Sequence, residues 1–322
     1  MTKPIFPMAG QGSLFRFSRY AVSLILLAAL FHKVDFREMV HDLARLSLAP
    51  VLLILGLAMG QIILTSLRWH LLLKSLRIVL PFRVVTEVNV ISILANTVLI
   101  NVIGGIVARV ALLAGRDVAA HVTLATLVLE RVLIAAVLLV MATAGLWLLP
   151  ISISAVKIPY VAIAPVMLAL VMTVLAARES PGLRKLLHPV RRYARLVAGG
   201  FARGARSRRV ISHSLLLTIA NQLLMIGMGV AIALALGVAV PLFDLAMLLP
   251  AVALLASLPI SVAGLGVREI SLVYILSLYA VPTEQAMLFS VLILFFSILG
   301  AVGMYIVLKA AKPLWPAKRG AN

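Results

Sequence analysis

The sequence predicts an all-α, polytopic membrane protein with about six full spans and two shorter segments broken by glycine. Of its 322 residues, 63% are apolar and only 12% are charged, and the mean hydropathy is +1.16. Soluble domains have about 45–50% apolar and about 25% charged residues, so this composition excludes a soluble enzyme, a disordered tail and a secreted disulfide scaffold. The chain has no cysteine, which excludes disulfides, thiolate nucleophiles and cysteine-based metal sites.

Six apolar runs have about the length that a membrane-spanning helix requires, near 20 residues. They cover residues 14–31, 46–67, 122–149, 158–177, 210–236 and 285–308. The first run follows basic residues, as in a signal peptide. However, Phe31-His32-Lys33 does not resemble a small-residue cleavage site and further spans follow, so we expect a retained first helix.

Two further apolar segments, 88–117 and 243–281, are interrupted by glycine close to a charge. Two full spans need about 40 residues. The first segment is too short for them, so we expect a re-entrant hairpin. The second segment, at 39 residues, fits either a hairpin or two full spans. The residues of the two breaks are Asn101, Gly104 and Gly105, and Pro259, Gly264 and Gly266.

The basic residues indicate how the chain is oriented. The formal net charge is +19, and Lys and Arg concentrate in 68–83, in 178–209 and in the C-terminal tail. Basic loops are retained in the cytoplasm, so we expect these segments and both termini on the cytoplasmic side of a bacterial plasma (inner) membrane. We expect the less basic connections outside: 32–45, 150–157, 237–244 and 281–285. No nucleic-acid-reading motif accompanies the charge, so we expect no nucleic-acid partner.

This orientation makes residues 1–322 a single transmembrane domain with halves 14–149 and 158–308 joined outside the membrane. If both broken segments are hairpins, each half consists of span, span, hairpin and span, and the two halves have opposite orientations. Transporters contain inverted repeats of this kind. The alternative is two unrelated halves with two ordinary spans in the second, and hydrophobic periodicity does not separate these interpretations.

The segment 178–209 contains ten Lys or Arg residues and one acid. Its apolar residues recur at helical spacing, which predicts a helix in the interface of the anionic cytoplasmic leaflet. Anchoring the topology is the simpler interpretation of this helix, and specific lipid recognition is the alternative.

Charged side chains inside a bilayer cost about 2.5–3.5 kcal/mol at a helix centre and therefore mark functional sites. Arg109 lies in the second limb of the first broken segment, and Glu130 and Arg131 lie within a long span. Arg268 and Glu269 follow the second glycine break. Adjacent residues point about 100° apart on a helix, so Glu130 and Arg131 need separate partners. We expect Arg109 to pair with Glu130, and Arg131 with Glu269.

We predict that these side chains converge in one polar cavity near the membrane midplane, because guanidinium groups bind phosphate bidentately. The alternative is that the ion pairs only hold the broken helices together. The candidate substrate-binding residues are Arg109, Glu130, Arg131, Arg268, Glu269 and Asn101. Glycine breaks expose backbone N–H groups that suit anions, and the candidate gating residues are Gly104, Gly105, Pro259, Gly264 and Gly266.

Motifs for catalysis are missing from the sequence. The six histidines have no metal-binding spacing, and there is no Walker loop or cluster of paired carboxylates. We therefore expect no enzymatic activity, no metal and no cofactor.

Four stretches occur in an order that resembles a known family: 67–74, 101–109, Leu129-Glu130-Arg131 and 258–269. Together they resemble the lysylphosphatidylglycerol synthase transmembrane family, the flippase-like domain. The resemblance implies an integral membrane domain that translocates lipids. Fused members carry an aminoacyl transferase domain that this chain lacks, so we expect a stand-alone member that does not lysylate lipid. The family usually has an Asp after the paired glycines, where this chain has Ile106.

The leading hypothesis is therefore a lipid flippase or transporter that moves a polar headgroup through the cavity while the tails stay in lipid. The resemblance allows an anionic phospholipid, a hopanoid or another polar lipid as cargo. The alternative is a membrane accessory subunit that presents substrate to a lipid- or glycan-modifying transferase without moving it.

Overall fold

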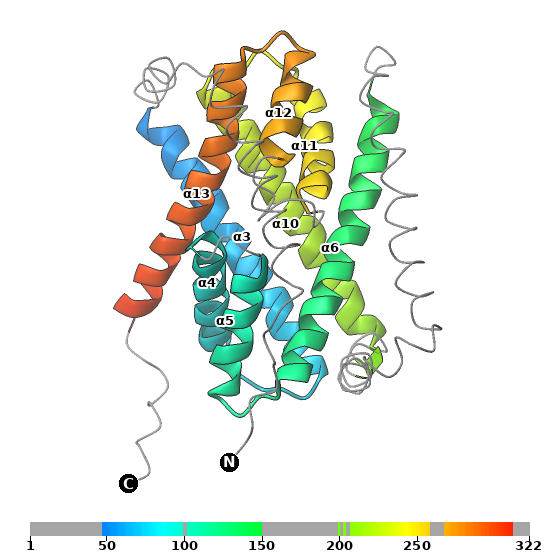
Figure 1. Ribbon diagram of the computed structural model, residues 1–322, viewed down its shortest axis with the longest axis vertical. Helices are drawn as coiled ribbons and strands as arrows, with labels where there is room; N and C mark the ends of the chain where they lie inside the picture. Colours follow the sequence, from blue (N-terminus) through cyan, green and yellow to red (C-terminus); the bar gives the residue numbers. More distant parts are fainter. Residues whose placement is uncertain are drawn as a thin grey trace, which may run out of the picture.

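The computed structural model describes residues 47–98, 102–149, 199, 202–203, 207–257 and 267–311. Within these ranges the chain forms eight helices and no strand (Figure 1). Four helices are long and apolar enough to cross a membrane. They are α3 (Leu48–Ser75), α6 (Ala120–Leu148), α10 (Arg208–Ala235) and α13 (Thr283–Ala310).

These four helices confirm four of the six expected spans. The other two, 14–31 and 158–177, lie outside the described residues, as does most of the basic segment 178–209. One boundary was wrong: α3 does not end at residue 67 but continues to Ser75. Arg68 therefore lies inside the helix. Its guanidinium binds buried partners, so it does not have to extend to the lipid headgroups.

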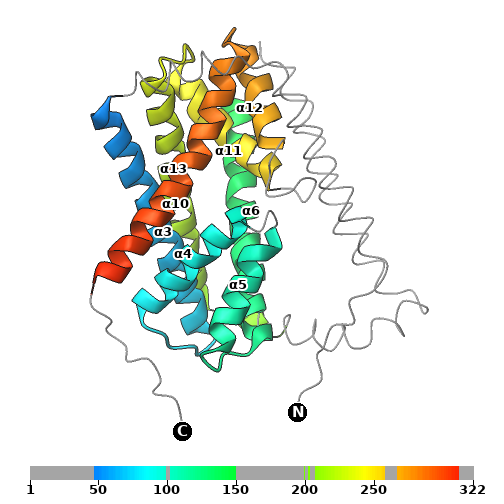
Figure 2. The same ribbon diagram turned by 60° about the vertical axis from the view of Figure 1, so that its left-hand side comes forward.

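The two broken segments each form a pair of short helices. The first pair is α4 (Phe82–Val98) and α5 (Val102–Ala114), and the second is α11 (Leu242–Ala256) and α12 (Val267–Ser277). Each is shorter than the roughly 20 residues of a full span. In Figures 1 and 2 each pair enters from one end of the molecule and returns to it, and the two pairs enter from opposite ends. Both segments are thus hairpins, and two full spans for 243–281 was the wrong alternative.

The packing repeats between the halves α3–α6 and α10–α13. The long helices α3 and α10 pack against each other. The contact of α4 with α13 corresponds to that of α11 with α6. In the same way, the contact of α3 with α13 corresponds to that of α10 with α6. The second half runs in the opposite direction to the first (Figure 1). This is the arrangement of an inverted repeat.

The turns repeat as closely as the helices. The turns after α3 and α10 each contain one residue with positive φ, Arg77 (63°) and Gly237 (64°). These two residues are 160 positions apart in the sequence. In both turns the next amide donates to the carbonyl five residues before it, which is the Schellman pattern that ends helices. The turns after α5 and α12 do the same around Asp117 (60°) and Ala280 (58°), 163 positions apart.

Charge separates the two ends of the molecule. The end where α10 begins and α13 ends carries basic residues such as Arg77, Arg208 and Lys309, and the opposite end carries Asp244 and Glu284. This grouping agrees with the predicted orientation. At the acidic end, the Tyr279 hydroxyl donates to Asp244 Oδ2 at 2.9 Å and joins the two ends of the second hairpin. Burial, and then this carboxylate, raise the pKa of Tyr279.

Candidate functional site

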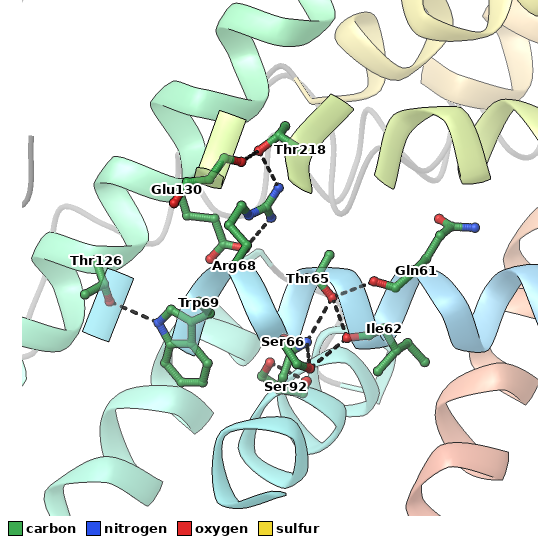
Figure 3. Close-up of polar contacts among 12 residues, drawn as sticks. Gln61, Ile62, Thr65, Ser66, Arg68, Trp69, Ser92, Thr126, Glu130 and Thr218 are labelled. Atoms are coloured by element: carbon green, nitrogen blue, oxygen red, sulfur yellow. Dashed lines mark hydrogen bonds and ion pairs between the residues drawn. The ribbon is translucent and has the colours of Figure 1, made fainter. Parts of the chain in front are cut away.

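A buried cluster of three charged side chains lies where α3, α5, α6 and α10 meet. Arg68 Nη2 donates to Glu130 Oε1 at 2.7 Å, and Arg109 Nη1 donates to Glu130 Oε2 at 2.7 Å. The Arg68 side chain is 1% exposed and the Glu130 side chain 8%. Figure 3 shows Arg68 between Glu130 of α6 and Thr218 of α10. One carboxylate thus holds two guanidinium groups from different helices, and we call these three residues the cationic cluster.

Uncharged side chains of α4 and α10 add hydrogen bonds to the cationic cluster. Arg68 Nη1 donates to the Thr218 hydroxyl at 3.1 Å. Arg109 donates to Asn89 Oδ1 at 2.5 Å and to the Ser92 hydroxyl at 3.0 Å, both on α4. The Arg109 guanidinium also lies 4.5 Å from the centroid of the Trp69 ring, in cation–π distance. Arg109 is therefore bound mainly to its own hairpin, whereas Arg68 is bound to the long helices.

The formal charges of the cationic cluster sum to +1, because arginine stays protonated in proteins and a single carboxylate faces two of them. Arg68 Nε is buried and has no hydrogen-bond partner among the described residues. A buried net charge is unfavourable unless it is paired. An anion near these guanidinium groups would supply the missing counter-charge.

A second ionic pair lies in the other half. Arg268 donates to Glu269 Oε1 at 2.5 Å, and the Ser290 hydroxyl of α13 contacts both residues. The formal charge of this pair is zero. Since the Arg268 side chain is 19% exposed, it is more accessible than Arg68. We call these two residues the neutral pair.

The cationic cluster and the neutral pair lie at comparable depths from opposite ends of the molecule. With a rise of about 1.5 Å per residue, Arg68 is about 10 Å from the end of α3 and Glu130 about 15 Å from the start of α6. Arg268 is about 14 Å from the end of α12. Counted along their helices, the two sites thus lie toward opposite ends of the molecule.

The predicted pairing of Arg109 with Glu130 is confirmed, and that of Arg131 with Glu269 is wrong. Arg268 forms the ion pair with Glu269, and Arg131 is exposed on α6. The physical reason is the 100° step between adjacent helical residues, which turns Arg131 to the outside when Glu130 faces the core. Instead of one cavity that contains all five charges, the described residues form two sites on different helices.

The paired glycines lie at the start of a helix, and one of their amides has a side-chain partner. They lie in the first turns of α5, and the Gly105 amide donates to Asn96 Oδ1 at 2.6 Å. Asn96 thus satisfies the N–H that we assigned to an anion. The remaining predicted residues, Asn101, Pro259, Gly264 and Gly266, lie outside the described residues.

Comparison with protein families gives one match that covers most of the chain. The family described as the lysylphosphatidylglycerol synthase TM region matches residues 17–303. The chain belongs to this family. The resemblance found in the sequence is confirmed, and the match concerns the transmembrane region. No curated protein matches the chain.

The sequence interpretation missed several site residues of this family member. The expected span 46–67 ended just before Arg68, which was not among the candidate substrate-binding residues, and Thr218, Ser92 and Trp69 were not predicted as partners. A usable signal existed for Arg68: Trp69, Leu72 and Leu73 continue the apolar face of α3 beyond it. The hydroxyl partners have no comparable signal, because Ser and Thr in apolar helices are common packing residues.

Proposed function

We propose that this transmembrane domain moves a lipid with an anionic headgroup across the bacterial plasma membrane, with the basic end of the molecule in the cytoplasm. The observation that carries the proposal is the buried +1 charge of Arg68, Arg109 and Glu130 beside a hairpin that does not cross the membrane. A phosphate accepts bidentate hydrogen bonds from arginine as a carboxylate does. It would therefore compete with Glu130 for the two guanidinium groups.

The two arginines would have different roles in this step. Arg68 is fixed between α6 and α10, so it would mark the binding position. Arg109 is bound by Asn89 and Ser92 within its hairpin, so exchange of Glu130 for a lipid phosphate would shift the hairpin relative to α6. The acyl chains would remain in the surrounding lipid.

The inverted second half supports an alternating mechanism. Its neutral pair lies at similar depth from the opposite end, and inverted repeats allow one gate to open while the other is closed. Outward movement of one negative charge is favoured by a membrane potential that is negative inside, by about 2.3 kcal/mol per 100 mV. The protein would then need no enzymatic activity and no cofactor for this step.

Reconstitution in liposomes tests the proposal. Vesicles contain a fluorescent anionic phospholipid, and dithionite bleaches the label in the outer leaflet only. Wild-type protein should increase the bleached fraction above the half that protein-free vesicles give, and Arg109→Gln should remove at least nine tenths of this increase. Arg116→Gln is the matched control, because Arg116 ends the same hairpin, is exposed and bonds its own backbone.

Wild-type protein that moves no more lipid than protein-free vesicles would contradict the proposal. So would equal losses in Arg109→Gln and Arg116→Gln when both elute as folded protein. Those results would favour an accessory subunit that presents lipid to a modifying transferase.

A further inference from the structure

A small pocket separate from the cationic cluster lies where α3, α4, α10 and α13 meet. Its volume is about 140 Å³. The residues that line it are Ala58, Gln61, Ile62, Thr65, Ile93, Asn221 and Ser297. None of them carries a formal charge, yet four have oxygen-bearing side chains.

Three of the polar residues lie at the middle of long helices. Gln61 and Asn221 are the fourteenth residues of the 28-residue helices α3 and α10, and Ser297 is the fifteenth of the 28 in α13. Gln61 and Asn221 are 160 positions apart, as are the turns that end their helices, so they occupy equivalent places in the two halves. The pocket thus lies near the membrane midplane and between the repeats, where transporters bind coupling ions.

The hydrogen bonds of the pocket leave oxygen atoms available as acceptors. Gln61 Nε2 is 3.5 Å from Met228 Sδ, which turns Oε1 away from that sulfur. The Thr65 hydroxyl donates to the Gln61 carbonyl, and the Ser297 hydroxyl donates to the Ile293 carbonyl, so their protons are used. Asn221 Oδ1 is buried without a hydrogen-bond partner among the described residues. Among the described residues, no positively charged side chain lines the pocket, and Asn221 Oδ1 is left without a donor.

We propose that this midplane pocket binds a monovalent alkali cation, and Na⁺ is the ion used to test it. Amide and hydroxyl oxygens are ligands that hard cations accept. Divalent cations in proteins rely on carboxylates, and no carboxylate lines this pocket. Metal-binding sequence motifs consist of histidine, cysteine and acidic residues. Their absence from the sequence therefore does not exclude a site built of uncharged oxygens.

The pocket is connected to the cationic cluster by Asn89. Its Nδ2 donates to the Thr65 hydroxyl at 3.0 Å, while its Oδ1 accepts from Arg109. Figure 3 shows Gln61 and Thr65 on the same helix as Arg68, and seven residues of helix separate Gln61 from Arg68 by about 10 Å. The +1 charge of the cluster opposes a nearby cation, and a bound anion would neutralise it. The cation and the anionic lipid should thus increase each other's affinity. This coupling rests on the proposed function, whereas cation binding itself does not.

Thermal unfolding of the purified full-length protein in neutral detergent tests cation binding without transport. NaCl is compared with choline chloride at equal ionic strength. Na⁺ should raise the unfolding temperature in a saturable way, because a ligand that binds only the folded state stabilises it by mass action. Asn221→Ala and Ser297→Ala should each weaken the apparent Na⁺ affinity at least 10-fold. Asn221→Asp, which adds a carboxylate, should strengthen it.

Ser212→Ala is the matched control, because Ser212 also donates to its own helix but lies exposed outside the pocket. If Asn221→Ala does not fold, Ser297→Ala and Asn221→Asp decide the result. Equal unfolding temperatures in NaCl and choline chloride would overturn the proposal. So would wild-type Na⁺ affinity in both Ser297→Ala and Asn221→Asp.

Adding anionic phospholipid separates this inference from the proposed function. The apparent Na⁺ affinity should rise at least threefold with the anionic lipid and should not rise in Arg109→Gln. Arginine-dependent lipid transport without any Na⁺ effect on stability would leave the proposed function standing and end the cation proposal. Na⁺ binding without lipid transport would support the cation proposal and contradict the proposed function.

Discussion

The halves α3–α6 and α10–α13 have the same four helices and the same turns, but opposite directions and different buried charges. By the spacing of the turns, Arg68 is equivalent to Met228, Arg109 to Leu272 and Glu130 to Ile293. The second half thus has apolar side chains at all three positions of the cationic cluster. Conversely, the neutral pair Arg268 and Glu269 is equivalent to Gly105 and Ile106. Backbone symmetry is retained while the electrostatics is asymmetric, as the proposed movement of an anionic lipid requires.

Removing the carboxylate of each half is the strongest test of this difference. Glu130→Gln leaves two guanidinium groups without an anion in a buried site. Breaking a buried ion pair costs about 3–5 kcal/mol, so we expect a large loss of folded protein and of thermal stability in detergent. Glu269→Gln leaves one guanidinium that is 19% exposed, so its effect should be clearly smaller. Equal losses in the two variants would contradict the asymmetry.

A change at the tip of the first hairpin should have an intermediate effect. A Cβ at Gly105 would lie 2.6 Å from the Asn96 side-chain amide. Gly105→Ala must therefore displace the side chain that accepts from its own amide, at a cost of about 1–3 kcal/mol, typical of overpacking. Thermal unfolding measures it. Gly56→Ala, where a Cβ meets no atom within 4 Å, is the control and should stay close to wild type.

The left-handed turns after α10 and α12 predict the smallest effects. Ala280, in the turn after α12, has positive φ without being glycine, whereas a glycine, Gly237, has a similar φ in the turn after α10. A left-handed conformation costs about 1 kcal/mol for a residue with a Cβ. Ala280→Gly should therefore stabilise the protein slightly and Gly237→Ala should destabilise it by a similar amount. Unfolding temperatures that move in the same direction for both variants would contradict the cost assigned to a Cβ in these left-handed turns.

Hydropathy and glycine placement were enough to predict the described spans and the first hairpin, and they left an inverted repeat as one of two alternatives. They did not decide between a hairpin and two spans for 243–281, since the length fitted both. The end of α3 was misplaced because a charge inside a span resembles a span boundary. Only tertiary contacts with Glu130 and Thr218 show that Arg68 stays in the helix.

The site could be predicted from the sequence only where a charged side chain had few possible partners of opposite charge. Arg109 and Glu130 were paired correctly for this reason. Whether Arg68, Arg131 or Arg268 pairs with a given carboxylate depended on which face of each helix lies toward the core. A helix that is apolar on all sides does not reveal that face in its sequence. Likewise, the division of the charges between two sites becomes visible only from how the two halves pack.

The direct test of the central claim is the ratio of anionic to zwitterionic phospholipid movement in liposomes, for wild type and Arg68→Met. This variant places the second half's residue at the equivalent position and leaves a neutral Arg109–Glu130 pair. Wild type should move the anionic lipid several times faster than the zwitterionic lipid, and the ratio should fall to about one in Arg68→Met. An unchanged ratio in a folded variant would contradict the claim that the buried positive charge selects the substrate.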